Sequence, residues 1–338
     1  MTGKPLRQKD YRAARSNTPE SIGPAALAVR LTARDRWLLR MLYEHQVLTS
    51  HQIAALGFTS RRVARRRLLT LFRYGVISRF TPYRTSGTHP THYVLATVGA
   101  QVLAAEEGLD LKELRWRADR AIGISLGIHL AHTVGVADWF TALATTARQR
   151  RDQTLGQWWS QTRCQRLWGD LVRPDAYGRW SVGDTTIEFF LEYDLGTENL
   201  GQLTRKLHGY SELAESTAIT TPLLIWLPTI RRETNARRAL HEIWRSLDNP
   251  AAVPIATAAA DFDNPEPHQP GPAGRVWLPL DSEPGTGRVH LHQLTRRWPR
   301  LTPPTVPTAD AEPGDAPLAR QTILAAPTPV PPAEAGEQ

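Results

Sequence analysis

The chain has 338 residues, more than one ordinary hydrophobic core usually holds. Its composition, 41% hydrophobic and 22% charged, excludes wholesale disorder. Its single cysteine, Cys164, excludes an intramolecular disulfide and a cysteine-rich metal site. No apolar run reaches the roughly 18 residues that a membrane span requires, and no apolar stretch follows the basic N-terminus. We therefore expect a soluble cytoplasmic protein without a secretory signal.

The net charge of +8 is unevenly distributed along the chain. Residues 1–95 contain 17 Lys and Arg against 4 Asp and Glu, a net charge of +13, so the remainder is net negative. This asymmetry is expected of a nucleic-acid-binding module joined to a body of different character. Proline enrichment near the C-terminus predicts an extended tail. We predict a flexible basic arm (1–29), a DNA-binding domain (30–115), a second domain (121–298) and a disordered Pro-rich tail (299–338).

Three short helices followed by two strands are predicted in the DNA-binding domain. Each helix is expected to begin at a residue that caps helices: Thr32, Thr49 or Ser50, and Thr59 or Ser60. Apolar residues recur at helical spacing after each of these positions. The segments VISRFTPYR and THYVLA then predict two strands around the turn TSGTHP, and a helix from Thr97 closes the domain. This order is typical of a winged helix-turn-helix.

The third predicted helix carries five arginines opposite its apolar side chains: Arg61, Arg62, Arg65, Arg66 and Arg67. In a helix-turn-helix this element enters the major groove, where the planar guanidinium binds guanine edges and phosphates. Arg79 and Arg84, near the hairpin tip, are predicted to contact the adjacent backbone or minor groove. A merely solvated face normally mixes charges, but no acidic residue lies between Glu44 and Glu106. We therefore predict binding to double-stranded DNA, although the fold also serves protein–protein contacts.

The second domain shows the element order α-β-β-β-α-β-α-β. A long apolar helix over 121–149 precedes three strand-like segments, QWWSQTRCQRLW, LVRPDAYGRWSV and TTIEFFLEYDLG. A helix (TENLGQLTRKLHGYSELAES), a strand (PLLIWLP), a helix (RETNARRALHEIWRSL) and a strand (RVWLPL) follow. A sheet flanked by helices is the natural architecture, so the chain is expected to be a two-domain protein of α+β and α/β class.

Three carboxylates and a lysine form the candidate catalytic site. Asp175 follows a proline at a predicted strand end, and Glu192 and Asp194 project from one face of an apolar, central strand. Converging carboxylates bind a hard ion such as magnesium, which activates water and neutralises charge on a phosphate. Lys206 lies on the next helix, on one face with Tyr210. We predict Asp175, Glu192 and Asp194 as magnesium ligands and, with Lys206, as catalytic residues.

Each of these residues also has an ordinary structural explanation: Asp175 as a turn residue, the strand carboxylates as edge charges and Lys206 as a solvent-facing side chain. His129 and His132 lack a matching metal-ligand pattern, so we expect packing or hydrogen bonding from them. Asp138, on the same helix, is a further candidate for the acidic cluster. Core packing is expected of Cys164 and of four tryptophans: Trp158, Trp159, Trp168 and Trp180.

Pro174, Asp175 and Glu192, in this order of elements, resemble the motif of the PD-(D/E)xK nuclease superfamily. The chain differs at Asp194, where that superfamily usually has a lysine, and the resemblance implies that Lys206 takes its place from the neighbouring helix. It implies a restriction-endonuclease-like domain that acts as a magnesium-dependent endonuclease or nickase. If catalytic activity has been lost, the resemblance implies that this domain serves DNA binding or assembly instead.

Over roughly residues 30–248 the chain resembles the replication-relaxation family of bacterial plasmids and conjugative elements. The most specific segments are RPDA, FFLEYDLGTE and KLHGY. The resemblance implies a role in plasmid replication and DNA relaxation, with recognition and nicking of duplex DNA and with replication or conjugation proteins as partners. The alternative is a non-enzymatic adaptor or repressor whose second domain serves homodimer formation or partner binding. A tyrosine relaxase is disfavoured because no histidine-triad pattern occurs.

Overall fold

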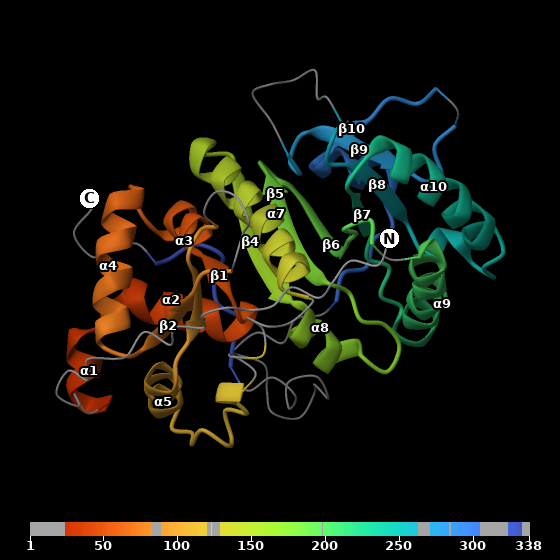
Figure 1. The fold of residues 1–338 in the computed structure, drawn as a ribbon. Helices are drawn as coiled ribbons and strands as arrows, with labels where there is room; N and C mark the ends of the chain where they lie inside the picture. Colours follow the sequence, from red (N-terminus) through yellow and green to blue (C-terminus); the bar gives the residue numbers. More distant parts are fainter. Residues whose placement is uncertain are drawn as a thin grey trace, which may run out of the picture. The chain divides into compact units, whose positions relative to one another are not determined.

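The computed structural model describes residues 24–82, 89–119, 123, 129–197, 199–262, 271–283, 285–304 and 324–332. The chain divides into two compact units, which are described separately: unit 1 (Met1–Gly127 with Ala333–Gln338) and unit 2 (Ile128–Pro332) (Figure 1). Both mix helices with a β-sheet. None of the helices in the described part of the chain is long and apolar enough to cross a membrane.

Unit 1 combines helices with a small antiparallel sheet. Its described elements are α1 (Pro24–Arg30), α2 (Ala33–His45), β1 (Leu48–Thr49), α3 (Ser50–Gly57), α4 (Arg61–Arg73), β2 (Ile77–Phe80), β3 (His92–Leu95) and α5 (Thr97–Glu106). The strands pair in the order β1-β3-β2. The three predicted helices, both predicted strands and the helix from Thr97 are therefore confirmed, whereas most of the turn TSGTHP lies outside the described residues.

Side-chain caps fix where the helices of unit 1 begin. Thr32 accepts a hydrogen bond from the backbone N–H of Asp35 at 3.2 Å, and the Asp35 carboxylate accepts one from the backbone N–H of Thr32 at 2.7 Å. Thr49 and Gln52 form the same reciprocal capping box before α3. Ser60 caps α4 through a backbone N–H of its first turn. These caps are the signals on which the helix predictions rested.

The prediction of a flexible arm over residues 1–29 is wrong for residues 24–29. Residues 24–29 belong to α1, because Leu27 is fully buried and α1 packs against α5. Leu27 thus provides an apolar packing contact that a free arm would lack. The residues before Pro24 lie outside the described part of the chain.

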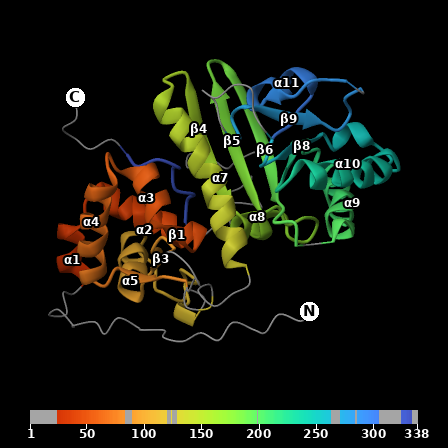
Figure 2. The same ribbon diagram turned by 45° about the horizontal axis from the view of Figure 1, so that its top comes forward.

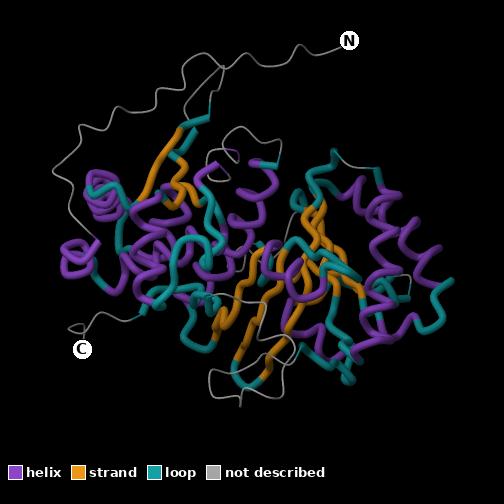
Figure 3. The backbone as a smooth tube through the Cα atoms, turned by 90° about the horizontal axis from the view of Figure 1, so that it is seen from below, coloured by secondary structure: helices purple, strands orange, loops and turns teal. Residues whose placement is uncertain are grey.

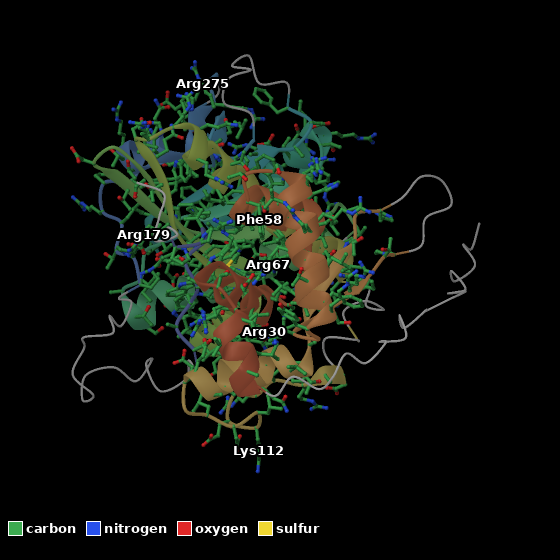
Figure 4. All side chains as sticks on the ribbon, turned by 90° about the vertical axis from the view of Figure 1, so that its left-hand side faces the viewer. Arg30, Phe58, Arg67, Lys112, Arg179 and Arg275 are labelled. Carbon is green, nitrogen blue, oxygen red and sulfur yellow. The ribbon has the colours of Figure 1, made fainter. Side chains whose placement is uncertain are left out.

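Asp35 also ties α2 to α4. Its carboxylate is buried and accepts two hydrogen bonds from the Arg67 guanidinium, the one from Nε measuring 2.8 Å. Arg67 also donates to the carbonyl oxygen of Arg30 at 3.3 Å, and Figure 4 labels both residues on their helices. Arg67, one of the five arginines predicted to bind DNA, therefore holds α1, α2 and α4 together.

Replacing Asp35 by alanine removes the buried acceptor of Arg67 and the carboxylate half of the capping box of α2, whereas Thr32 still caps the helix. We expect the free energy of unfolding to fall by about 2–3 kcal/mol, since a hydrogen bond to a charged group contributes roughly 1.5–3 kcal/mol. Urea unfolding followed by circular dichroism measures the change. Glu106→Ala is the control, because its pairs with Arg36 and Arg40 are partly exposed and should contribute under about 1 kcal/mol. Equal losses in the two variants would contradict the assignment.

A seven-stranded sheet forms the body of unit 2 within the described residues. In chain order the elements are α7 (Leu130–Gln149), β4 (Gln153–Ser160), α8 (Gln161–Trp168), β5 (Ala176–Val182), β6 (Thr185–Tyr193), α9 (Leu200–Thr217), β7 (Leu223–Leu227), α10 (Ile230–Arg245), η1 (Pro250–Ala252), β8 (Ile255–Ala259), β9 (Arg275–Pro279), β10 (Val289–His290), η2 (Leu291–Gln293) and α11 (Leu294–Arg297). The strand order is β10-β9-β8-β7-β6-β5-β4. β6, β7 and β8 are parallel, and the other neighbours are antiparallel (Figure 3, strands in orange).

Helices cover both faces of this sheet (Figure 2). On one face, Phe140 of α7 stacks on Trp158 and Phe189. On the other face, Trp159 and Phe190 pack among side chains from α8, α9 and α10. Adjacent residues of one strand therefore enter opposite layers, as strand alternation requires. The core positions expected for Cys164 and the four tryptophans are confirmed, because all five are at most 5% exposed.

Two element predictions in unit 2 are corrected. The second half of QWWSQTRCQRLW forms α8 instead of continuing the strand, because Ser160 caps a helix by accepting from the N–H of Arg163 at 3.2 Å. The segment IATAA, for which no element was predicted, forms β8 with all five residues buried. Part of the predicted long helix, including residues 121–122 and 124–128, lies outside the described residues.

Part of the predicted disordered tail packs on unit 2. Leu324 is buried, and its carbonyl oxygen accepts a hydrogen bond from Nη2 of Arg163 at 2.9 Å. Ala326 packs against the core between the sheet and α8 to α10. Disorder is therefore wrong for residues 324–332, which an apolar residue and a buried guanidinium hold in place.

Candidate functional site

The candidate site lies at one edge of the unit 2 sheet, where several strand ends meet. Because β6 and β7 are parallel, their carboxyl ends share this edge. The start of β5 and the end of β4 reach it too, because these strands are successively antiparallel. Asp175 precedes β5, Glu192 lies at the end of β6 with Asp194 just after it, and Arg232 follows β7. The topology therefore gathers residues that are far apart in the sequence.

These strand ends and the neighbouring helices surround a pocket of about 40 Å³. A space of roughly 10–15 Å³ is enough for one water molecule, so the pocket has room for small polar groups. Six acidic and basic side chains line it: His132, Asp175, Glu192, Asp194, Lys206 and Arg232. The structure thus brings together all four residues predicted as catalytic, and it adds His132 and Arg232 to them.

Asp175 is buried and has three hydrogen-bond partners. Its Oδ2 lies 3.0 Å from Nε2 of His132 and accepts the backbone N–H of Tyr193 at 2.8 Å, while Oδ1 accepts from Nε2 of Gln161 at 3.3 Å. Burial favours the protonated form, but the hydrogen bond from His132 and the charge of Lys206 outweigh it and lower the pKa of Asp175. Asp175 is therefore a carboxylate held in one orientation.

Glu192 is 2% exposed, and its two oxygens have different partners. Tyr210 donates its hydroxyl to Oε1 at 2.8 Å, and Lys206 forms an ion pair with Oε2. Burial and the charge of Asp175 raise the pKa of Glu192 from its ordinary 4.5 to about 7, although Lys206 opposes this change. Two neighbouring carboxyl groups with divergent pKa values are common at sites that handle protons or ions.

Lys206 reaches the carboxylates from the first half of α9. It lies four residues before Tyr210, and both side chains contact Glu192, which is the shared helix face that the four-residue spacing predicted. The Lys206 side chain is 32% exposed, whereas that of Glu192 is 3% exposed. The lysine therefore links a buried carboxylate to the solvent side of the pocket.

Asp194 lies just after β6 and has partners of its own. Its backbone N–H continues the sheet by donating to the carbonyl oxygen of Trp226 at 2.9 Å. Its carboxylate accepts from the backbone N–H of Gly196 at 2.6 Å and from Nε of Arg232 at 2.7 Å. No group of three or more His, Cys, Asp and Glu side chains in the described part of the chain is arranged to hold a metal ion. Asp175, Glu192 and Asp194, as placed in the described part of the chain, are therefore not arranged as one metal-binding cluster.

Magnesium binding by Asp175 and Glu192 stays a prediction. Magnesium binds through one or two carboxylates and keeps several of its waters. Asp175 and Glu192 line the same pocket, which has space for water-sized ligands. Oxygen donors and space are therefore both present for a hydrated ion.

His132 lies in the first turn of α7 and has the hydrogen-bonding role that the sequence favoured for it. Burial lowers its pKa, but the hydrogen bond and charge of Asp175 outweigh burial and raise the pKa. The His132 ring meets Tyr193 edge-on at 5.9 Å, and Gly135 allows this approach because a Cβ there would lie 2.5 Å from the tyrosine ring. Asp138, also on α7, is exposed and does not line the pocket.

The arginines predicted to contact DNA belong to unit 1, whereas the pocket belongs to unit 2. Four of them are exposed along α4, opposite its buried apolar residues: Arg61, Arg62, Arg65 and Arg66. Among the described residues, no acidic side chain forms an ion pair with these four. Arg79 is exposed on β2 and stacks over Phe72 at 4.4 Å, and Arg84 lies outside the described residues.

Comparison with known proteins gives one result. The family model described as replication-relaxation matches residues 39–223, just over half of the chain, from α2 in unit 1 to the first residue of β7 in unit 2. The matched range contains α4 and the residues of the pocket except Arg232. No curated protein and no solved structure matches the chain significantly.

Proposed function

The chain belongs to the replication-relaxation family, and we propose that it binds duplex DNA through unit 1 and cleaves a phosphodiester bond in the pocket of unit 2. Membership of this family indicates a role related to plasmid replication and relaxation. The observation that carries the cleavage proposal is the joint burial of Asp175 and Glu192 beside Lys206. In this proposal unit 1 is a winged helix-turn-helix and unit 2 is a nuclease domain like those of the PD-(D/E)xK superfamily.

Two buried carboxylates at a sheet edge are costly for folding. Burial of a charge is unfavourable unless it is paired, and even a paired buried charge is often less stabilising than an apolar residue. The raised pKa of Glu192 reflects this cost, because the fold opposes its ionisation. Such a destabilising arrangement supports a chemical role more than a structural one.

Each pocket residue has its own task in the proposed reaction. Asp175 and Glu192 would hold the magnesium ion, which when bound supplies charge neutralisation for the phosphate and activation of water. Tyr210 keeps Glu192 in place through Oε1, and His132 orients Asp175. Lys206, partly exposed beside Glu192, binds the phosphate and stabilises the negative charge that develops during cleavage.

The arrangement of unit 1 supports the DNA-binding part of the proposal. α3 and α4 pack against each other and are separated by a short turn, and the antiparallel strands β2 and β3 follow. In the proposed helix-turn-helix, α4 is the recognition helix that enters the major groove. Its exposed arginines then contact base edges and phosphates, with Arg79 on the adjacent strand near the backbone.

Incubation of the full chain with its supercoiled cognate plasmid and magnesium tests the proposal. We expect conversion to the open-circular form, and we expect it to be lost in EDTA and in Asp175→Ala. Asp170→Ala is the matched control, because Asp170 is an exposed acid in the same unit that does not line the pocket. Binding of the plasmid by the wild-type protein without nicking would instead support the adaptor or repressor. Equal nicking by wild type and Asp175→Ala would refute the catalytic assignment.

A further inference from the structure

Three acid–base pairs line the pocket, and in each pair the base is the more exposed partner. The exposed fractions of base and acid are 24% and 7% for His132–Asp175 and 32% and 3% for Lys206–Glu192. They are 21% and 10% for the third pair, Arg232–Asp194. The carboxylates thus form the buried side of the pocket and the cations its accessible side. A pocket of this kind attracts an anion to its accessible side.

The third pair is fixed to the protein from both sides. Asp194 is held by its backbone bond to β7 and by the N–H of Gly196, which adopts a positive φ of 78° in the turn after β6. Arg232 lies in the first turn of α10, where its backbone N–H donates to the side chain of the N-cap residue Thr229 at 3.1 Å. The guanidinium therefore has a defined position beside the pocket.

A purely structural role accounts poorly for this pair. The neighbouring residue on α10, Glu233, shows what a structural pair looks like in this protein. It pairs with Arg288, which is 13% exposed and also donates to the carbonyl oxygen of Val276 at 2.6 Å, and neither residue lines the pocket. Arg232, in contrast, lines the pocket and is more exposed, and a partly exposed ion pair contributes little to stability.

We propose that Arg232 binds a phosphate group of the nucleic-acid substrate in this pocket, and that Asp194 positions the guanidinium instead of binding a metal ion. The inference deepens the proposed function and rests on it for the identity of the substrate, a phosphodiester. Arginine suits the task because its planar fork matches two phosphate oxygens, whereas Lys206 acts as a point charge. The phosphate then lies between cations from two helices, α9 and α10, above the carboxylates of Asp175 and Glu192.

Calorimetric titration of the full chain with inorganic phosphate in EDTA tests the inference without requiring cleavage. We expect measurable binding by wild type, about tenfold weaker binding by Arg232→Gln, and partial recovery in Arg232→Lys. Arg231→Gln, which removes an exposed neighbouring arginine outside the pocket, should bind phosphate like wild type. Absence of binding by wild type, or equal affinities of Arg232→Gln and Arg231→Gln, would overturn the inference.

The role of Asp194 has a separate test. We expect Asp194→Asn to weaken phosphate binding several-fold, because the guanidinium loses its charged partner, and to leave the magnesium concentration that half-saturates nicking unchanged. Asp175→Asn should retain phosphate binding like that of wild type and lose nicking at every magnesium concentration. An increased magnesium requirement in Asp194→Asn would make Asp194 an ion ligand and overturn its assignment as a positioning residue. Phosphate binding without nicking by wild type would contradict only the proposed function, since the titration does not depend on cleavage.

Discussion

Glu192→Gln is expected to reduce nicking at least about 10³-fold and, at the same time, to stabilise the protein at pH 8. Glutamine keeps the Oε1 acceptor of Tyr210 and the shape of the side chain, but it removes the charge that would bind magnesium and Lys206. Loss of an ion that stabilises transition-state charge removes several kcal/mol, and about 4 kcal/mol corresponds to 10³-fold in rate.

The stabilisation follows from the raised pKa of Glu192. A folded-state pKa of about 7, against an ordinary 4.5, means that the folded protein binds the proton more tightly than the unfolded chain does. The stability contributed by the protonated form is complete below pH 4.5 and is lost as the pH rises through 7. At about 1.4 kcal/mol per pH unit, the ionised side chain costs the fold roughly 3 kcal/mol at pH 8. Glutamine has no such cost, and the partly exposed Lys206 can be solvated.

Urea unfolding at pH 5 and pH 8, together with the plasmid assay, measures both effects. The stability difference between Glu192→Gln and wild type should grow by about 1–3 kcal/mol from pH 5 to pH 8. Glu188→Gln is the matched control: Glu188 lies on the same strand and is only 9% exposed, but it pairs with Arg179 away from the pocket. Nicking by this control should equal that of wild type. Unchanged nicking in Glu192→Gln, or a stability difference independent of pH, would contradict the prediction.

The simultaneous change of Arg61, Arg62, Arg65 and Arg66 to alanine is expected to weaken duplex DNA binding by about 10²–10³-fold. Each phosphate contact contributes about 0.9 to the slope of log K against log salt concentration, so the slope should become shallower by up to about 3.6. The buried face of α4 is untouched and alanine favours helix, so the unit should remain folded.

Fluorescence anisotropy with labelled duplex DNA at several salt concentrations gives the affinity and the slope together. Arg238→Ala with Arg245→Ala is the control, because these arginines are equally exposed on α10 of unit 2. Binding like wild type by the α4 variant would refute recognition through α4. So would an equal loss of affinity in the α10 control, because the interaction would then follow total charge alone.

The fold was predictable where a local chemical signal marks the structure. Thr32, Thr49 and Ser60 cap the helices of unit 1, and the sequence shows them directly. Ser160 is an equivalent signal for α8, but the aromatic strand residues Trp158 and Trp159 directly before it extend the strand pattern over it and hide the cap. The sequence of β8 has no capping residue at its start and no alternation of apolar and polar residues. Its small residues are buried on both faces of the sheet, so the usual two-residue pattern of a strand is absent.

The candidate site was predictable only where its residues are close in sequence. Glu192 and Lys206 are 14 residues apart on consecutive elements, so the sequence alone predicts that both belong to one site. His132 lies 43 residues from its partner Asp175 in the sequence, and Arg232 lies 38 residues from its partner Asp194. Such contacts depend on strand order, which no local pattern reveals. Asp194 was placed with Glu192 on one strand face, but β6 ends at Tyr193 and a turn follows.

The packing of residues 324–332 on unit 2 has a consequence for how the protein is made. Ribosomes release the chain from its N-terminus, and domains begin to fold as they emerge. The surface that Leu324 covers, beside Arg163 of α8, stays exposed until residue 324 has been synthesised. A messenger with a premature stop before codon 324 therefore yields a unit 2 with exposed apolar surface. We expect such a product to unfold more readily than the full chain, because apolar surface that Leu324 covers is then exposed to water.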